Sequence, residues 1–237
     1  MPESPDRLEV RGLSAWYGEA QALRDVDLTV GHGEVVTLVG RNGAGKTTLL
    51  RSVMGLHPHA TGAVVLDGTD VSRLSPDARA RRGLGWVPDD RGIYASLSVE
   101  ENLLLPPVTR PESAWSLEQV YAEFPVLRER ADFPGTRLSG GEQQMLAMAR
   151  VLRSGATLLV LDEPSEGLAP VIVQRIGEII RTIKEQGTSV LLVEQNVTFA
   201  ATVADRHHLL AQGRVVESLD NDEFRARREE LLDHLGM

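Results

Sequence analysis

Two glycine-containing segments of this sequence have residue types that bind phosphate, and the first is GRNGAGKTT, residues 40–48. It fits the pattern G-x-x-x-x-G-K-[ST] and lies between an apolar run and a helical pattern, which is the context that the pattern requires. Its glycines let consecutive backbone N–H groups point at one phosphate, and the helix N-terminus adds its dipole. We therefore predict a nucleotide site made by Gly40, Arg41, Asn42, Gly43, Ala44, Gly45, Lys46, Thr47 and Thr48.

Two residues of this loop have predicted roles of their own. Lys46 would neutralise the β- and γ-phosphate oxygens, and the Thr47 hydroxyl would be a ligand of Mg²⁺. Lysine is rare in this chain, because 23 of the 25 basic residues are arginines and the second lysine is Lys184. An ammonium is a compact point charge that fits inside a loop where a forked guanidinium would not. We therefore infer that position 46 requires a lysine and not an arginine.

The segment TLLVLDEP, residues 157–164, places two carboxylates directly after an apolar run. Ligands gather at the carboxyl edge of a parallel sheet, so both side chains are expected to face the nucleotide. We predict that Asp162 holds Mg²⁺, directly or through water, and that Glu163 is the general base for the attacking water. Gln195, in LLVEQN after the next apolar run, can orient a group near the γ-phosphate but cannot take up a proton. The alternative is that the two acids only begin a loop.

The second phosphate-binding segment is LSGGEQQMLAMAR, residues 138–150, in which two glycines open an amphipathic helix. Its candidate nucleotide-binding residues are Ser139, Gly140, Gly141 and Glu142. Within one chain it cannot easily serve the nucleotide of residues 40–48, because that phosphate is already surrounded by the loop, the lysine and magnesium. We therefore predict that this segment contacts a nucleotide that is bound by another molecule.

The pattern of apolar residues indicates an α/β fold with a mostly parallel sheet. Residues 8–17 and 22–30 alternate like antiparallel strands, and they predict an N-terminal antiparallel β-layer. Three continuous apolar runs predict strands that are buried on both faces, at residues 35–39, 158–161 and 190–193. Helical spacing follows each of them, at residues 46–54, 171–185 and 197–204. We expect a P-loop NTPase core with this topology.

Residues from about 88 to 153 differ from the rest, because they contain helix-like segments and no convincing strand. The predicted helices are residues 98–105, 117–130 and 142–153. We expect one domain over residues 1–237, in which residues 1–87 and 154–237 form the α/β core and residues 88–153 form an inserted α-helical subdomain. Residues 221–237 predict one or two short helices that pack through Leu231, Leu232 and Leu235.

Composition excludes several classes of protein. Hydrophobic residues make up 42 % and charged residues 25 % of the chain, and no apolar run approaches the ~18 residues that span a bilayer. The absence of cysteine excludes disulfides, thiolate chemistry and Cys-ligated metal sites, and the start MPESPDRLEV lacks the features of a secretory signal. A net charge of -9 argues against nucleic acid as a partner. We interpret His207 and His208 as half-buried strand residues and not as metal ligands.

The order of the motifs GRNGAGKTT, LSGGEQQ and LLVLDEP resembles the ATP-binding cassette (ABC) family over nearly the whole chain. The resemblance implies ATP and Mg²⁺ as cofactors. It also implies that two cassettes meet head to tail, so that Ser139, Gly140 and Gly141 of one close over the γ-phosphate that the other binds. Tyr17 matches the aromatic residue that stacks on adenine, the alternative being an ordinary strand tyrosine. Residues 165–168 match the loop that crosses the dimer axis.

Further segments resemble the ATP-binding subunits of bacterial branched-chain amino acid importers, namely AWYGEAQAL, VPDDRGIYASLSVEENLLL, DEPSEGLAP and LLVEQN. Importers of urea or short amides share most of these segments. This resemblance implies transmembrane permease subunits as partners, with an extracytoplasmic solute-binding protein as an indirect one. It places the chain in the cytoplasm, peripheral to the membrane. Tyr94, Ser96 and Leu97 are candidate permease contacts, unless they only pack the helical subdomain.

Two positions depart from most cassettes. Asp89 stands where most members carry a glutamine that senses Mg²⁺ and the permease, and Gln195 stands where most carry a histidine at the γ-phosphate. Asp89 is a candidate catalytic residue and metal ligand, but an anionic side chain repels the γ-phosphate unless Mg²⁺ or Arg91 screens it. We therefore expect a heterodimer with a second, different cassette, while a homodimer stays open.

Two other classes remain as alternatives. A cassette without a permease, working in translation, DNA maintenance or cofactor assembly, would carry the same nucleotide motifs. However, the chain has neither two cassettes nor long coiled-coil segments. A P-loop kinase or GTPase would leave LSGGEQ unexplained, and the sequence has no NKxD-type base-reading motif. Co-purification with membrane proteins would separate a transport subunit from a soluble cassette.

Overall fold

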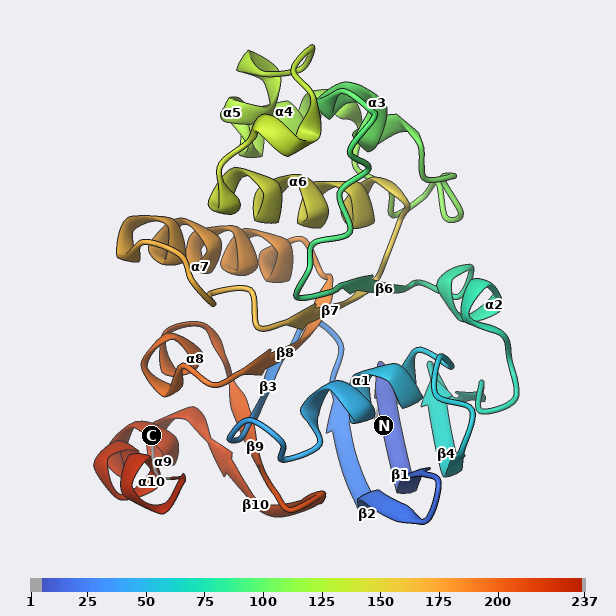
Figure 1. Cartoon of the computed structure of the whole chain (residues 1–237), viewed down its shortest axis with the longest axis vertical. Coiled ribbons are helices and arrows are strands. Elements are labelled where there is room, and N and C mark those ends of the chain that lie inside the picture. Colours follow the sequence, from blue (N-terminus) through green and yellow to red (C-terminus); the bar gives the residue numbers. More distant parts are fainter. Residues whose placement is uncertain (1–5, 236–237) are drawn as a thin grey trace, which may run out of the picture.

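The computed structural model describes the backbone of residues 6–235 and the side chains as far as Leu231, and it contains two β-sheets (Figure 1). The first is a four-stranded sheet in the order β2-β1-β4-β5. All of its paired strands are antiparallel, as the sequence predicted for the N-terminal layer. Its strands are β1 (Leu8–Tyr17), β2 (Ala20–Val30), β4 (Ala60–Leu66) and β5 (Thr69–Asp70).

The second sheet has six strands in the order β10-β9-β3-β8-β7-β6 and is mostly parallel. The five strands from β9 to β6 are parallel, and β10 pairs antiparallel with β9 at the edge. The carboxyl ends of the parallel strands therefore lie along one edge. The strands are β3 (Val35–Val39), β6 (Leu84–Val87), β7 (Leu158–Asp162), β8 (Ser189–Glu194), β9 (Arg206–Ala211) and β10 (Arg214–Asp220).

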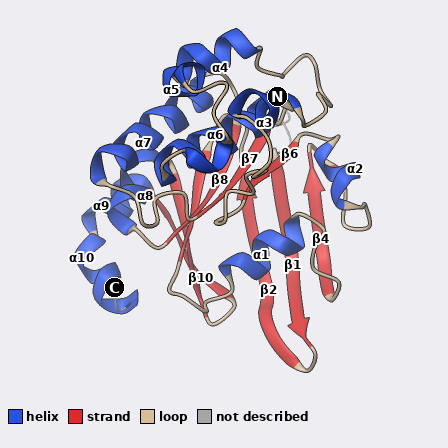
Figure 2. Ribbon diagram, turned by 45° about the horizontal axis from the view of Figure 1, so that its top comes forward, coloured by secondary structure: helices blue, strands red, loops and turns tan. Residues whose placement is uncertain are grey.

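Helices cover both faces of this parallel sheet, which explains the continuous apolar runs in its strands. Helix α1 (Lys46–Val53) packs in the core between the two sheets, where it meets Leu158 and Val160 of β7. The alternate residues Leu159 and Leu161 face the opposite cluster, which contains α6 (Gly140–Arg153) and α7 (Pro170–Glu185). Figure 2 shows the antiparallel strands as a separate group beside α1.

The helices between β6 and β7 lie beyond α6 on the side away from the sheet (Figure 1). The prediction of one helix over residues 117–130 is wrong, because two short helices meet at Phe124. Pro125 begins the second of them, and Phe124 has a φ of -120° and a ψ of 67° that are not helical. Proline has no N–H and disfavours a helical conformation in the preceding residue. These helices are α3 (Val99–Leu104), α4 (Leu117–Glu123), α5 (Pro125–Glu129) and the 3₁₀ turn η1 (Gly135–Arg137).

No elements were predicted for residues 56–87, where the structure has β4, β5, β6 and α2 (Pro76–Ala80). His207 and His208 were predicted in a strand and lie in β9, but the bounds of this strand and its hairpin with β10 were not predicted. The remaining helices are α8 (Val197–Val203), α9 (Asn221–Ala226) and α10 (Arg228–Leu235). Leu231 is buried as predicted, while the side chains of Leu232 and Leu235 lie outside the described residues. The division of the chain at residues 88 and 153 stays a prediction.

None of the helices in residues 6–235 has both the length and the apolar character that crossing a membrane requires.

His207 and His208 lie in β9 and are fully buried, so the prediction that they are half-buried is wrong. The ring of His207 stacks on Phe224 at 3.6 Å between centroids. Its Nε2 lies 3.1 Å from Asn221 Oδ1, which can only accept, so Nε2 carries the proton. Nδ1 then accepts from the Thr37 hydroxyl at 2.6 Å. Burial lowers the pKa of both histidines to about 4.

These two histidines are expected to make the protein less stable in acid. The folded pKa of about 4 lies below the ordinary value of 6.5, so the unfolded state binds more protons between these pH values. Their contribution is complete above pH 6.5 and is lost as the pH falls toward 4, by about 3 kcal/mol for each histidine. Urea denaturation at pH 7 and 4.5 measures this loss. His207→Gln should remove about half of this loss, whereas a substitution of the exposed His59 should not change it. An equal loss of stability between pH 7 and 4.5 in His207→Gln and in the parent would contradict the prediction.

Candidate active site

The predicted phosphate loop connects β3 to α1, and its backbone geometry depends on glycine at three positions. Gly43 and Gly45 have φ values of 81° and 111°, in the left-handed region that side chains disfavour. A Cβ on Gly40 would lie 2.5 Å from the carbonyl oxygen of Leu210 in β9, which is closer than atoms can approach. The loop therefore needs glycine for its own turn and for its contact with the neighbouring strand.

The N-terminal turn of α1 presents free backbone donors to this loop. Leu49 N–H donates to the carbonyl of Gly45 at 2.9 Å, so the amides of Lys46, Thr47 and Thr48 precede the helical ladder. Among the described residues, none caps this helix with a side chain, and its first turn contains no acidic residue. Free N–H groups and the positive end of the helix dipole together fit an anion.

A pocket of about 800 Å³ opens beside the loop. The predicted residues Asn42, Gly43, Gly45, Lys46, Thr47 and Thr48 line it together with Tyr17 and Glu163. Sequence reasoning missed the opposite wall, which comes from β2 and from the turn between β9 and β10. The residues of that wall are Gln21, Ala22, Arg24, Ala211, Gln212, Gly213, Arg214 and Val216.

The turn between β9 and β10 is attached to the phosphate loop by Gly213. The N–H of Gly213 donates to the carbonyl of Ala44 at 2.9 Å, and its own carbonyl accepts from Arg24 N–H at 2.8 Å. A Cβ on Gly213 would lie 2.2 Å from the carbonyl oxygen of Ala22. The glycine after Gln212 was the available sequence signal for this turn, but its contact with Ala44 depends on strands that are far apart in the sequence.

Tyr17 ends β1 at the rim of the same pocket. The residue is 52 % exposed, and its ring meets the His57 ring edge-on at 4.8 Å between centroids. Its hydroxyl lies 3.5 Å from the Thr48 hydroxyl. An exposed aromatic face beside a phosphate loop is available for stacking on a base, which a tyrosine buried in the strand would not be.

Glu163 lies opposite Lys46, and both side chains are largely buried. Lys46 Nζ lies 3.0 Å from Glu163 Oε1, and it also donates to the carbonyls of Gly40 at 2.7 Å and Arg41 at 3.2 Å. Glu163 has a φ of 47°, an unusual value for a residue with a side chain, and its N–H donates to the carbonyl of Val193 at 2.9 Å. The structure therefore brings the predicted general base to the predicted phosphate-binding lysine.

Asp162 ends β7 and is 2 % exposed. Its Oδ2 is buried without a hydrogen-bond partner among the described residues. Burial raises its pKa to about 6, and the charges of Asp89 and Glu163 add to this effect. A buried carboxylate oxygen without a partner fits a cation, and oxygen ligands are those that Mg²⁺ prefers. The described residues contain no group of three or more carboxylates or histidines that could hold a metal ion.

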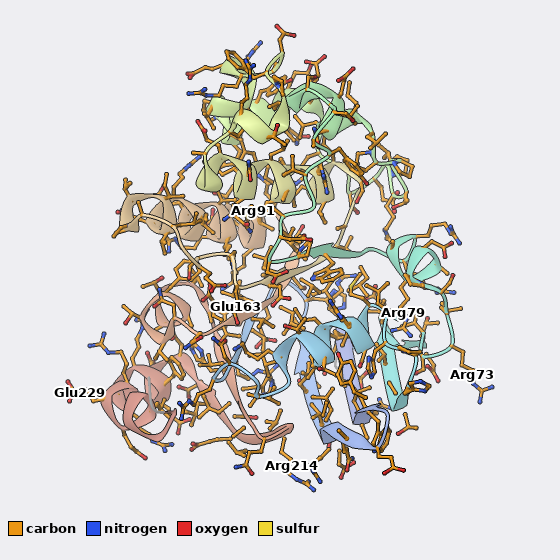
Figure 3. All side chains as sticks on the ribbon, viewed as in Figure 1. Arg73, Arg79, Arg91, Glu163, Arg214 and Glu229 are labelled. Carbon is orange, nitrogen blue, oxygen red and sulfur yellow. The ribbon has the colours of Figure 1, made fainter. Side chains whose placement is uncertain are left out.

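Arg91, which the sequence offered as a screen for the charge of Asp89, forms no ion pair with it among the described residues. Asp89 is exposed, and its Oδ1 accepts from the N–H of Asp90 at 2.9 Å. Arg91 Nη1 instead lies 3.4 Å from Gln143 Oε1 in α6. Its guanidinium also lies beside Gly140, 3.3 Å from where a Cβ would be. Figure 3 shows Arg91 closer to α6 than Glu163 is. Asp89 still raises the pKa of Asp162, so its charge reaches the candidate metal site.

Gln195 shares a second pocket with Glu163. This pocket has a volume of about 400 Å³, and it lies where the loops after β7 and β8 meet. Its walls are Glu163, Ser165, Glu166, Gly167, Glu194, Gln195 and Asn196. The structure therefore brings the predicted amide to the same side of the site as the predicted base.

The second glycine-containing segment lies outside both pockets, at the start of α6. Ser139 and Glu142 hold the end of this helix, since Ser139 N–H donates to Glu142 Oε2 at 2.7 Å and Glu142 N–H to Ser139 Oγ at 3.4 Å. A Cβ on Gly141 would lie 2.4 Å from Ile172 Cγ2, so this glycine is required for the packing of α6 on α7. Ser139 is exposed and Gly140 half-buried, which leaves this end open to another molecule.

Comparison with known proteins agrees with this geometry. The family model described as "ABC transporter" matches residues 23–166. The branched-chain amino acid transport ATP-binding protein BraG of Pseudomonas aeruginosa is 43 % identical over 86 % of this chain and 88 % of its own length. The probable LivF protein of Archaeoglobus fulgidus is 37 % identical over 94 % of this chain and 92 % of its own. The lipopolysaccharide export protein LptB of Escherichia coli K12 is 36 % identical over 88 % of each.

Solved structures have the same fold. A nucleotide-free ATP-binding cassette from an ABC transporter superposes with a TM-score of 0.86, at 21 % identity, over 98 % of this chain and 99 % of its own. A structure of an ATP-binding subunit of an ABC transporter has a TM-score of 0.83 at 27 % identity, over 97 % of this chain and 99 % of its own. The predicted α/β fold, with an antiparallel N-terminal sheet and a mostly parallel P-loop sheet, is confirmed.

Proposed function

Because this chain belongs to the ABC transporter family and is a transporter ATPase, we propose that it powers the import of branched-chain amino acids. The observation that supports this substrate is the 43 % identity with BraG, together with 37 % identity with LivF. LptB, at 36 % identity, makes lipopolysaccharide export the second candidate. Import of urea or short amides remains a weaker alternative, and a cassette without a permease is weaker still.

In the proposed hydrolysis, the loop of residues 40–48 holds the β- and γ-phosphates of ATP through its amides and Lys46. The three donors of the Lys46 ammonium are already engaged by Gly40, Arg41 and Glu163. A phosphate oxygen must therefore replace at least one of them. Replacement of Glu163 releases its carboxylate, so that binding of the nucleotide frees the base.

Thr47 and Asp162 would hold Mg²⁺, and Asp89 lies close enough to contribute its charge. Bound Mg²⁺ would neutralise negative charge on the phosphate oxygens. Glu163 takes the proton of the attacking water, and Gln195 orients a group at the γ-phosphate without taking the proton. Tyr17 stacks on adenine at the open end of the larger pocket. These roles are proposals that rest on the shared pockets and on the unpartnered Asp162 oxygen.

We infer that a second cassette completes the ATP-binding site. Ser139, Gly140, Gly141 and Glu142 lie outside the pocket that Lys46 lines, so these residues serve a nucleotide on another subunit. Because Asp89 and Gln195 depart from most cassettes, the proposed partner is a different cassette, with a homodimer as the alternative. The pair would lie on the cytoplasmic face of the membrane beneath permease subunits, and a solute-binding protein would act indirectly. Tyr94, 48 % exposed, remains a proposed permease contact with Ser96 and Leu97.

The test is to isolate the tagged chain with its membrane partners from its own cells and to reconstitute the complex in proteoliposomes. Leucine-, isoleucine- or valine-loaded binding protein from the same cells should raise ATP hydrolysis and drive uptake of the amino acid. The Lys46→Ala complex is the matched control and should do neither. Stimulation by urea or short amides only, ATP-driven extraction of lipopolysaccharide, or a chain that purifies without membrane proteins would contradict the proposal.

A further inference from the structure

Glu194 is a buried carboxylate to which the proposed hydrolysis assigns no role. It is the last residue of β8 and is 2 % exposed. Among the described residues, no basic side chain forms an ion pair with it, and burial is the main reason that its pKa is raised to about 7. A buried acid is costly unless hydrogen bonds compensate it, so the groups that it binds indicate what it does.

The two oxygens of Glu194 bind two different loops. Oε1 accepts from the backbone N–H of Ser165 at 3.1 Å, and Oε2 accepts from the N–H of Asn196 at 3.2 Å. Ser165 follows Glu163 by two residues, and Asn196 follows Gln195 directly. Asn196 in turn accepts from Phe199 N–H at 3.0 Å and begins α8. One side chain therefore joins the loop of the proposed base to the loop of the proposed orienting amide.

The loop of Glu163 needs such support because its backbone is strained. A φ of 47° at a residue with a side chain persists only where the surroundings hold it. Glu163 N–H donates to the carbonyl of Val193 at 2.9 Å, and two residues later Ser165 N–H donates to Glu194. The last two residues of β8 thus hold the chain at the strained residue and just beyond it.

We propose that Glu194 is a positioning residue for ATP hydrolysis. By binding the N–H groups of Ser165 and Asn196, it keeps Glu163 at a fixed position relative to Gln195. This inference rests on the proposed roles of Glu163 and Gln195. Glu194 lines the 400 Å³ pocket of Glu163 and Gln195 but not the 800 Å³ pocket that holds Lys46. Its removal therefore affects the rate of hydrolysis and not the affinity for ATP. A displacement of about 1 Å in a catalytic group lowers a rate by about 100-fold.

The experiment compares Glu194→Ala and Glu194→Gln with the parent in the protein's working complex. Glutamine has nearly the same shape, but its amide group would face one of the two N–H donors. Glu34→Gln is the control, because Glu34 Oε2 also accepts from a backbone N–H, that of Gly31 at 2.6 Å, at the opposite end of the sheet, where Glu34 also pairs with Arg206 at 3.0 Å. ATP affinity is measured by equilibrium binding in EDTA, and kcat and KM are measured with MgATP. Amide hydrogen exchange reports on residues 163–168.

We expect kcat to fall by about 10- to 100-fold in Glu194→Ala and by less in Glu194→Gln, with ATP affinity changed by no more than about threefold. Exchange over residues 163–168 should become faster, and Glu34→Gln should keep the parental kcat. A folded Glu194 variant with parental kcat, an equal loss in Glu34→Gln, or failure of both Glu194 variants to fold would overturn the inference. Absence of ATP hydrolysis by the parent would instead refute the proposed function itself.

Discussion

Glu163→Gln is expected to lower kcat for ATP hydrolysis by about 10²- to 10⁴-fold, which is the usual contribution of a general base. The amide of glutamine keeps the shape of the side chain but cannot take a proton from water. ATP should still bind, because the Lys46 ammonium loses only its 3.0 Å contact with the Glu163 carboxylate. Steady-state hydrolysis and equilibrium ATP binding separate the two effects.

Glu185→Gln is the matched control, because it makes the same chemical change at an exposed residue at the end of α7. It should hydrolyse ATP at the parental rate. If Glu163→Gln also did so, the assignment of the base would be wrong.

Glu163→Gln should also retain ATP in a closed dimer, which size-exclusion chromatography detects. A dimer that forms from this chain alone would contradict the proposed heterodimer, whereas one that needs a second cassette would support it.

Lys46→Ala is expected to weaken ATP binding by about 10²- to 10³-fold. Lys46 is 5 % exposed, and the loss of one member of a buried charge pair costs about 2–5 kcal/mol. In the variant the bound phosphate lacks its cation, and the charge of the Glu163 carboxylate beside it is no longer balanced by Lys46. Isothermal titration with ATP in EDTA measures the loss without hydrolysis.

Lys184→Ala is a matched control, because Lys184 is the second lysine of the chain and pairs with Asp205 at 2.5 Å, outside the residues that line the nucleotide pocket. It should bind ATP like the parent. Arginine at position 46 is informative too, since it keeps the charge but is too wide for the loop; we expect it to bind ATP little better than alanine does. Parental affinity in Lys46→Ala would remove the phosphate-binding role from this loop.

Local patterns predicted the elements whose signals lie within a few residues of one another. The apolar runs before Gly40, Asp162 and Gln195 are strands in the structure, because burial on both faces removes polar residues from them. Residues 56–87 were not assigned, although β4 pairs with β1 over residues 60–66. That pairing joins segments about 50 residues apart, and no periodicity in either segment reports it.

The predicted helix over residues 117–130 shows a local signal that was overlooked. Pro125 was visible in the sequence, and a proline at that place ends or breaks a helix at the preceding residue. Gly141 shows the opposite case. The sequence suggested a nucleotide contact for it, while the structure adds a requirement for space, because Ile172 of α7 lies where a Cβ would be. That contact joins two helices, and the sequence of neither helix alone predicts it.

The sequence alone determined the family and the ATPase class, and it predicted the residues that would carry the chemistry, because each motif is a short segment whose spacing is set by one phosphate or one strand end. The tertiary structure decided which residues meet. It placed the turn at Gly213 against Ala44, directed Arg91 toward Gln143 and away from Asp89, and joined Ser165 to Asn196 through Glu194. These contacts depend on the order and register of six strands, and that order is settled by burial over the whole core.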